Sequence, residues 1–237
     1  MTLLDRTELS TDEAQYWFWG QELGFGAYSK PPLIGWLIRL ATEIMGQSVW
    51  AVRLPAVGLH ALTAVVLYQT ARRLAPDPLP MVSALSYLVA PAVALGSAVM
   101  TTDTPMLLSA SVALLAQVRL AEARAAGHTA PMVALGLGLA LGLGVLAKHA
   151  MLFWMVGAGA AALLSPAFRP KGSDLLLALA MAAVVVAPHV LWLYRHDFIT
   201  ASHVADITRG TMPTLWRPLR FVAEQFAVAR CRWGWPR

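Results

Sequence analysis

Long apolar segments dominate this sequence and restrict the folds that it can adopt. A helix that crosses a bilayer needs about 20 mostly apolar residues. Such segments occur at roughly 50–70, 80–100, 104–121, 131–147, 149–168 and 174–194. Charged residues make up only 13% of the chain, whereas a soluble domain has about a quarter. The sequence therefore predicts an all-α integral membrane protein whose residues 49–194 form a six-helix transmembrane region.

Two segments outside this region have a different composition. Residues 1–48 carry an acidic doublet and, after Pro31, a short mixed stretch. Trp36 and Arg39 in that stretch suit an interfacial helix better than a span. We expect residues 1–48 to form an external loop with interfacial helices. Residues 195–237 are expected to form a second external loop and an incomplete further helix over 221–229.

The distribution of basic residues predicts which loops share a side of the membrane. One set of short loops carries Arg72, Arg73, Arg119, Arg124, Arg169 and Lys171, whereas the opposite short loops carry only Lys148. Because cytoplasmic loops are enriched in Lys and Arg, the first set is expected in the cytoplasm. The outer face then gathers these polar residues: Asp12, Glu13, Lys30, Asp103, Lys148, Arg195, His196 and Asp197.

The composition excludes several classes of protein. The net charge of +5 comes from basic residues that punctuate apolar segments, and no long basic stretch is interleaved with aromatic residues. We therefore expect no nucleic-acid partner. The single cysteine, Cys231, excludes an internal disulfide. The sequence contains no nucleophile elbow, phosphate loop or dinucleotide fingerprint.

The acidic doublet Asp12-Glu13 is the first candidate site. Adjacent side chains on a helix diverge by about 100°, so the two carboxylates cannot form one paired-carboxylate site. One carboxylate would face a substrate, and the other would orient the loop or bind a partner. The structural alternative is a helix N-terminus, with Ser10 or Thr11 as the cap and the acids in the first turn.

Lys30 is the second candidate, because Pro31-Pro32 forbid helix there and hold the preceding residue extended. Flanked by Tyr28 and the membrane-anchoring Trp36, it is well placed to meet a lipid phosphate. The alternative is an ordinary lysine that snorkels to a headgroup.

Asp103 lies in a short turn between two apolar segments. A carboxylate on the same face as Asp12 would suit sugar hydroxyls or a second acidic role. Alternatively, Thr102 or Asp103 caps the next helix, with Pro105 near its first turn.

Lys148-His149 interrupt an otherwise apolar stretch over 135–164. Ionisable residues there are costly unless they meet water, an anion or a functional cavity. His149 alone is also typical of a polar helix interface. His189 lies deep in the last apolar segment without partner spacing, so neither a metal site nor a cofactor is expected.

Taken in order, these motifs resemble glycosyltransferase family 39/83, which includes protein O-mannosyltransferases and the aminoarabinose transferase of lipid A. The matching stretches are Thr11-Asp12-Glu13-Ala14-Gln15-Tyr16-Trp17, Tyr28-Ser29-Lys30-Pro31-Pro32-Leu33, Ala51-Val52-Arg53-Leu54-Pro55, Met100-Thr101-Thr102-Asp103-Thr104-Pro105 and Leu146-Ala147-Lys148-His149. The resemblance covers about residues 10–210.

The resemblance implies a GT-C fold, in which an external loop with interfacial helices lies over a helical bundle. Such enzymes transfer a sugar from a polyprenyl-phosphate donor to a lipid, glycan or protein acceptor on the periplasmic side of the inner membrane. It also implies roles: Asp12 as the catalytic carboxylate, Glu13 as its support and Asp103 as a second acid. Lys30 and Lys148 would clamp the lipid phosphate as it leaves.

Two departures bear on the substrate. Family members often have an acid where this chain has Ser29, and in the aminoarabinose branch that acid helps to hold a metal. An arginine often found soon after the doublet in that branch is replaced by Gln15. Both changes point away from aminoarabinose transfer and predict no metal site.

Length is a further departure. Family members typically have a spanning helix before the doublet and further helices plus an outer domain after it. Residues 1–10 cannot span, and residues 230–237 are unlike a membrane helix. We expect a truncated or frame-disrupted member. The alternatives are an inactive fragment of such an enzyme, and a non-enzymatic transporter or scaffold that uses Lys148 and Asp103 for helix pairing or substrate passage.

Overall fold

The computed structural model describes residues 8–208, Trp216 and Arg220, and in these residues it contains helices but no strand. The helices are α1 (Thr11–Gln21), α2 (Leu33–Met45), α3 (Val49–Leu74), α4 (Leu79–Leu88), α5 (Pro91–Gly96), α6 (Asp103–Ala125), α7 (Pro131–Ala147), α8 (Met151–Leu164), the single 3-10 turn η2 (Pro166–Phe168), α9 (Gly172–Arg195) and α10 (Ile199–Thr208). The predicted all-α class is confirmed. The further helix expected over 221–229 lies outside the described residues.

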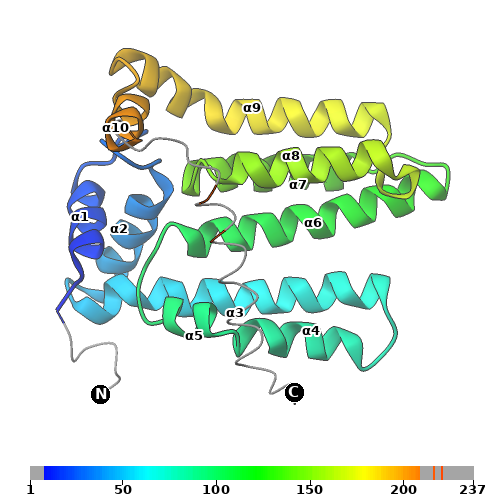
Figure 1. Cartoon of the computed structure of the whole chain (residues 1–237), viewed down its shortest axis with the longest axis horizontal. Coiled ribbons are helices and arrows are strands. Elements are labelled where there is room, and N and C mark those ends of the chain that lie inside the picture. Colours follow the sequence, from blue (N-terminus) through cyan, green and yellow to red (C-terminus); the bar gives the residue numbers. More distant parts are fainter. Residues whose placement is uncertain (1–7, 209–215, 217–219, 221–237) are drawn as a thin grey trace.

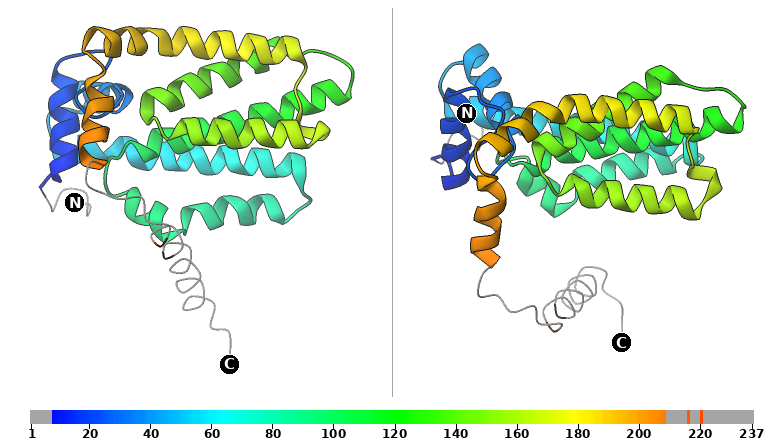
Figure 2. Two further views of the ribbon diagram at one scale, coloured as in Figure 1. Left: turned by 45° about the horizontal axis from the view of Figure 1, so that its top comes forward. Right: turned by 90° about the horizontal axis from the view of Figure 1, so that it is seen from above.

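The long helices run side by side and form a bundle (Figures 1 and 2). Helix α7 lies between α9 and α6, and α3 packs on α6 and on α4. Helices α1 and α2 lie across one end of this bundle, where α10 also lies. The end that carries α1 and α2 is therefore the end at which α6 begins and α7 and α9 finish.

Helices α3, α6 and α9 are long and apolar enough to cross a bilayer, and α4, α7 and α8 are apolar but shorter. The continuous helix expected over 80–100 is not observed, because α4 ends at Leu88 and α5 begins at Pro91. Proline has no amide hydrogen, and it biases the residue before it toward extended backbone. Ala90 adopts that conformation, with φ −61° and ψ 127°.

Glycines allow α7 to approach α9 closely. A Cβ atom added to Gly138 would lie 2.2 Å from the carbonyl oxygen of Ala178, and one added to Gly142 would lie 2.6 Å from Cβ of Val185. Both distances are shorter than any ordinary contact. By contrast, a Cβ atom on Gly136 would meet nothing within 4 Å. Close backbone approach at small residues is typical of helix packing in membranes.

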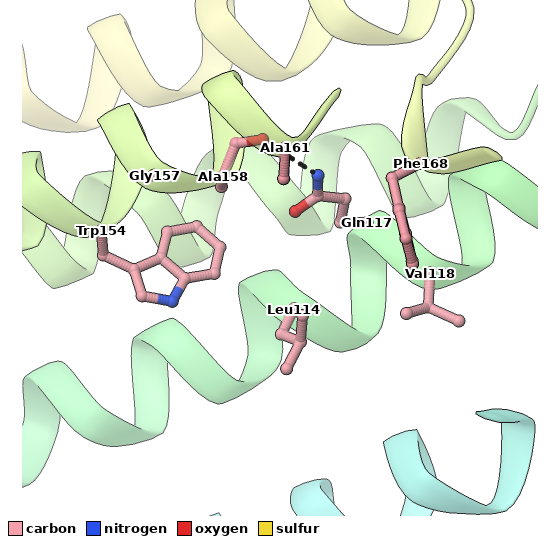
Figure 3. Close-up of a pocket in the computed structure, with 8 residues that line it drawn as sticks. All are labelled: Leu114, Gln117, Val118, Trp154, Gly157, Ala158, Ala161 and Phe168. Atoms are coloured by element: carbon pink, nitrogen blue, oxygen red, sulfur yellow. Dashed lines mark hydrogen bonds between the residues drawn. The ribbon is translucent and has the colours of Figure 1, made fainter. Parts of the chain in front are cut away.

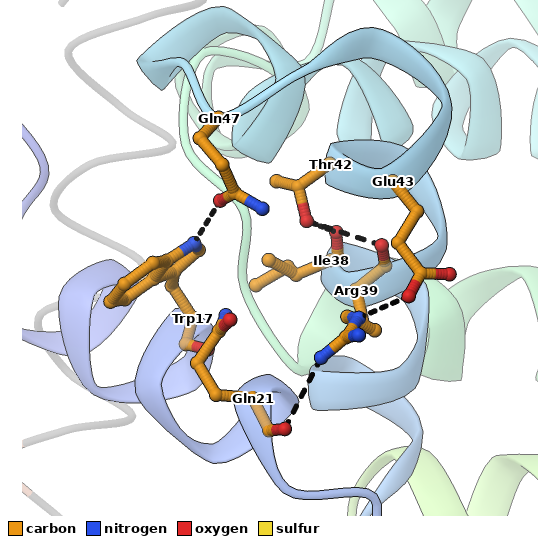
Figure 4. A network of polar contacts seen from close by, with 7 residues as sticks. All are labelled: Trp17, Gln21, Ile38, Arg39, Thr42, Glu43 and Gln47. Atoms are coloured by element: carbon orange, nitrogen blue, oxygen red, sulfur yellow. Dashed lines mark hydrogen bonds and ion pairs between the residues drawn. The ribbon is translucent and has the colours of Figure 1, made fainter.

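Helices α1 and α2 also cross at glycines. A Cβ atom on Gly20 would lie 2.7 Å from the carbonyl oxygen of Gly35. Hydrogen bonds around the crossing hold the pair together (Figure 4). The indole Nε1 of Trp17 donates to Gln47 at 2.8 Å, and Arg39 donates to the carbonyl oxygen of Gln21 at 3.2 Å. The helix predicted after Pro31 is thus confirmed as α2, tied to the doublet-bearing α1.

Replacing Gly138 with alanine should lower the free energy of unfolding by about 1–3 kcal/mol, because the added methyl group overpacks the contact with α9. The matched variant Gly136→Ala should be neutral or more stable by up to about 1 kcal/mol, because alanine has the higher helix propensity. Denaturant unfolding of both variants in detergent, followed by circular dichroism, measures the difference. Equal stability of the two variants would show that α7 and α9 do not pack as described.

Candidate functional site

A buried ion pair joins the acidic doublet to the bundle. Arg53 of α3 donates from Nε to Oε1 of Glu13 at 2.8 Å and from Nη2 to Oε2 at 2.9 Å. The backbone amide of Met100, just before α6, donates to Oε1 at 3.2 Å. Glu13 is fully buried and Arg53 nearly so. One carboxylate therefore joins α1, α3 and the start of α6.

Glu13 also completes the N-terminus of α1. Its backbone amide donates to Oγ of Ser10 at 3.3 Å, and its carboxylate accepts from the backbone amide of Ser10 at 2.9 Å. This reciprocal arrangement is a capping box. The capping alternative is thus realised for Ser10 and Glu13. With both oxygens engaged, Glu13 is suited to positioning its neighbours and not to touching a substrate.

The environment of Glu13 keeps it ionised. Burial raises the pKa of its carboxyl, but the hydrogen bonds from Arg53, Ser10 and Met100 outweigh that effect, and the net shift is downward. Arg53 had no role assigned from sequence, although it stands in one of the family stretches. The available signal was its position near the start of an apolar helix, where an unpaired charge is costly.

Asp12 points away from this pair and is exposed, as the divergence of adjacent helical side chains predicts. One turn later, Tyr16 is almost fully buried. Burial, together with the charges of Asp12 and Asp103, raises the pKa of the Tyr16 hydroxyl to about 12. Both carboxylates therefore act on the same phenol, which stays protonated. Sequence analysis gave Tyr16 no role.

Asp103 and Lys148 meet at the same end of the bundle. Nζ of Lys148, at the end of α7, lies 2.8 Å from each carboxylate oxygen of Asp103, the first residue of α6. The Asp103 side chain is 51% exposed and that of Lys148 is 34% exposed. Thr102, at the N-cap position, makes no side-chain capping bond. The capping alternative is therefore not realised by Thr102.

Lys30 sits in the loop between α1 and α2, just before the buried Pro31 and Pro32. The carbonyl oxygen of Lys30 accepts from the amide of Ala27 at 3.1 Å, which closes a turn. Helix α2 begins directly after the two prolines, as expected. Lys30 is half-buried, and none of the carboxylates in residues 8–208 forms an ion pair with it.

Two histidines face each other beside this loop. Nε2 of His149, between α7 and α8, lies 3.1 Å from Nε2 of His189 in α9. Nδ1 of His189 is 2.7 Å from the carbonyl oxygen of Phe25. Sequence analysis treated His189 as isolated, because 40 residues separate it from His149. Tyr28 is exposed, and its ring centroid lies 4.7 Å from that of His203 in α10.

The structure thus divides the candidate residues into two groups at one end of the bundle. The charges of Asp12 and of Asp103, which pairs with Lys148, act on Tyr16, while the charge of Lys30 acts on His149 of the histidine pair. Carboxylates can orient a hydroxyl group, and an unpaired cation can hold a phosphate. Within the described part of the chain, no three metal-ligating side chains come together.

A separate hollow of about 380 Å³ opens between α6 and α8 (Figure 3). Its lining is mainly apolar, and its single polar side chain is Gln117, which donates to the carbonyl oxygen of Ala158 at 3.5 Å. The lining residues are Leu114, Gln117, Val118, Trp154, Gly157, Ala158, Ala161 and Phe168. No candidate residue from the sequence lines this hollow.

Comparison with known proteins finds a matching family and several similar curated proteins. The sequence profile described as dolichyl-phosphate-mannose-protein mannosyltransferase matches residues 29–192. The lipid A galacturonosyltransferase RgtD of Rhizobium johnstonii is 40% identical over 96% of this chain and 48% of its own length.

Two further proteins of the same organism are similar. The lipopolysaccharide core galacturonosyltransferase RgtA is 28% identical over 86% of this chain and 41% of its own length. The lipopolysaccharide core galacturonosyltransferase RgtB is 30% identical over 84% of this chain and 40% of its own length. The chain therefore spans half or less of the curated relatives that it matches. No solved structure matches it.

Removing one partner of the buried ion pair should destabilise the protein strongly. Arg53→Met leaves the Glu13 carboxylate buried without its main partner, and we expect a loss of about 3–5 kcal/mol in the free energy of unfolding. The double variant Glu13→Gln/Arg53→Met should recover most of that loss, because no uncompensated charge remains. Denaturant unfolding of the three proteins in detergent measures both effects. A double variant that is as unstable as the single one would contradict this account.

Acid should weaken the same contact. Because the pKa of Glu13 is lowered from 4.5 in the folded protein, its carboxylate contributes stability above pH 4.5, and that contribution is lost as the pH falls through the folded pKa. The melting temperature of the wild type should therefore fall more steeply below pH 4.5 than that of Glu13→Gln. Parallel melting curves for the two proteins from pH 6 to pH 3 would contradict the assignment.

Proposed function

The chain belongs to the dolichyl-phosphate-mannose-protein mannosyltransferase family, and we propose that it carries the donor site of a membrane glycosyltransferase. The sugar would come from a polyprenyl-phosphate donor and pass to a lipid, glycan or protein acceptor on the extracytoplasmic face of the inner membrane. One observation carries the proposal. Two carboxylates, Lys148 paired with one of them, and Lys30, which has no ion-pair partner among the described residues, lie at the end of the bundle that α1 and α2 cover.

The charge distribution supports the placement on the extracytoplasmic face. The opposite end of the bundle carries basic side chains in its loops and helix ends, including Arg72, Arg73, Arg124, Arg169 and Lys171. Most of them are engaged there: Arg73 pairs with Glu122, and Arg124, Arg169 and Lys171 donate to the carbonyl oxygens of Pro166, Leu163 and Gly127. Loops rich in Lys and Arg favour the cytoplasmic side.

Lys30 would hold the donor phosphate. It is half-buried and has no carboxylate partner in the described residues, so an anionic ligand would relieve the cost of the unpaired charge. In the reaction the bond between the anomeric carbon and the phosphate oxygen breaks, and its electron pair stays on the phosphate. A nearby cation stabilises that developing charge.

Asp12 would act on the acceptor. As the new bond forms between the acceptor oxygen and the anomeric carbon, the hydroxyl proton passes to the Asp12 carboxylate. Glu13 and Arg53 hold α1 in place beneath it, which makes Glu13 a positioning residue. Asp103 would bind sugar hydroxyls. Lys148 would leave Asp103 and bind an anionic group of the donor other than the phosphate held by Lys30.

The relatives point to the sugar. They are named lipid A and lipopolysaccharide core galacturonosyltransferases. We infer that this chain also takes a galacturonosyl donor and that its acceptor is lipid A or the lipopolysaccharide core. Such a donor carries two anions, the phosphate and the sugar carboxylate. The site offers two lysines for them, Lys30 and Lys148.

The exposure of the Asp103–Lys148 pair bears on the non-enzymatic alternative. A transporter or scaffold would use this pair to hold α6 to α7. The two side chains are 51% and 34% exposed, and an exposed ion pair contributes about 0–1 kcal/mol. Helix pairing therefore explains the pair poorly, whereas a substrate that exchanges partners with it explains both its charge and its exposure.

The variant Asp12→Asn should reduce sugar transfer by about 10²–10⁴-fold, because the general base is lost. The matched control is Glu22→Gln, which neutralises an exposed carboxylate just after the other end of α1. Membranes that contain each protein are incubated with labelled polyprenyl-phosphate galacturonic acid, and the label in lipid A is measured. Full activity of Asp12→Asn would contradict its role. No transfer by the unaltered, correctly inserted chain would favour the inactive fragment.

The variant Lys30→Met should raise the KM for the donor and lower kcat/KM about 100-fold, because it removes the cation for the phosphate. Lys30→Arg should retain part of the activity. Lys171→Met, at the opposite end of the bundle, serves as the control for a lost surface lysine. Equal kinetics of Lys30→Met and Lys171→Met in the same membrane assay would overturn the assignment.

A further inference from the structure

We propose that Nδ1 of His149 accepts a hydrogen bond from the donor-sugar hydroxyl next to the anomeric carbon, and that His189 and the Phe25 carbonyl hold His149 in the tautomer that permits it. This inference rests on the proposed function and adds a specificity-determining residue to its site. His149 and His189 have no role in the steps described above.

The hydrogen-bond chain fixes the tautomer of each histidine. The carbonyl oxygen of Phe25 can only accept, so Nδ1 of His189, 2.7 Å away, carries the hydrogen. In a neutral His189, Nε2 then carries no hydrogen and can only accept a hydrogen bond. Nε2 of His149, at 3.1 Å, must donate to it. The remaining nitrogen, Nδ1 of His149, is therefore an acceptor, and no described residue donates to it.

The surroundings of His149 favour its neutral ring. The titratable groups that act on His149 are His189 from α9 and Lys30 from the loop, whereas its chain neighbour Lys148 is paired with Asp103. Burial first, then His189 and Lys30, lower the pKa of His149 below its ordinary value. A neutral ring accepts a hydrogen bond through Nδ1, whereas the protonated ring does not.

The loop that carries Lys30 is held against the same helix. Phe25 is bound by His189, and a Cβ atom on Gly26 would lie 2.3 Å from Cε3 of Trp192. This contact requires a glycine at position 26. Two successive residues of the loop are thus fixed on α9, only four residues before Lys30. The cation and the acceptor nitrogen are therefore held by one rigid support.

The chemistry of the donor places a hydroxyl beside the phosphate. In a sugar 1-phosphate, the anomeric carbon bears the phosphate oxygen, and the neighbouring carbon bears the 2-hydroxyl. A phosphate held by Lys30 thus brings the 2-hydroxyl toward the next polar group of the site. His149, which feels the charge of Lys30, is such a group. Hydrogen bonds to this hydroxyl also strengthen as the glycosidic bond breaks.

Donor analogues test this assignment. Membranes with each protein are given polyprenyl-phosphate galacturonic acid or its 2-deoxy analogue, and kcat/KM is measured for both. Because a donor without the 2-hydroxyl is intrinsically more reactive, the informative quantity is the ratio of the two kcat/KM values in each variant compared with that ratio in the wild type. In His149→Leu the ratio of kcat/KM for the hydroxylated donor to that for the 2-deoxy donor should be about 10-fold lower than in the wild type. His149→Asn places an oxygen near the Nδ1 position and should restore part of this ratio.

The positioning role of His189 is tested by the same ratio. His189→Leu removes the acceptor for Nε2 of His149, frees its tautomer and should also reduce the preference between the donors. Equal losses on both donors in His149→Leu would show a structural role and overturn the proposal. If the wild type transfers neither sugar, the proposed function fails and this inference fails with it.

Discussion

The ion pair between Glu13 and Arg53 is the contact on which the arrangement of the site depends. It is buried, bidentate and completed by the amide of Met100. Such a pair adds little net stability, but it fixes the relative positions of the helices that it joins, because breaking it leaves a buried charge without a partner. It fixes the start of α1 on α3 and beside the start of α6. Because Asp12 precedes Glu13 in the first turn of α1, the pair also fixes the backbone position of Asp12, although the Asp12 side chain is exposed.

Local features of the sequence predicted the all-α fold class and the set of helix ends that lie together at one end of the bundle. Apolar runs of about 20 residues predict helices, and alternating charged loops predict which helix ends lie together. The break between α4 and α5 was missed, although Pro91 marks it, because mean hydropathy over 80–100 does not register a missing amide hydrogen. Helix α7 has the predicted bounds, 131–147, whereas α8 covers only Met151–Leu164 of the predicted 149–168.

The sequence predicted that the candidate residues lie at one end of the bundle, but it did not predict most of the contacts between them. Asp103 and Lys148 were expected on one face, but their direct contact depends on where α6 begins and α7 ends. The buried roles of Arg53 and Tyr16 were missed because a single residue in a helix carries no spacing pattern. His189 seemed isolated for the same reason. Its partners, His149 and the Phe25 carbonyl, lie 40 and 164 residues earlier in the chain and meet it only after the helices pack.

The attachment of the Lys30 loop to α9 has a consequence for biosynthesis. Phe25 and its partner His189 are 164 residues apart, and α9 is the last long helix of the described bundle. A nascent chain that ends after α6 contains the partners of Glu13, which are Arg53 and Met100. It lacks His189 and Trp192, the residues that the Lys30 loop contacts on α9. The contacts of Glu13 can therefore form before α9 is in place, whereas the attachment of the Lys30 loop requires α9. Under the proposed function, phosphate binding at Lys30 would thus depend on a helix that lies far from it in the sequence.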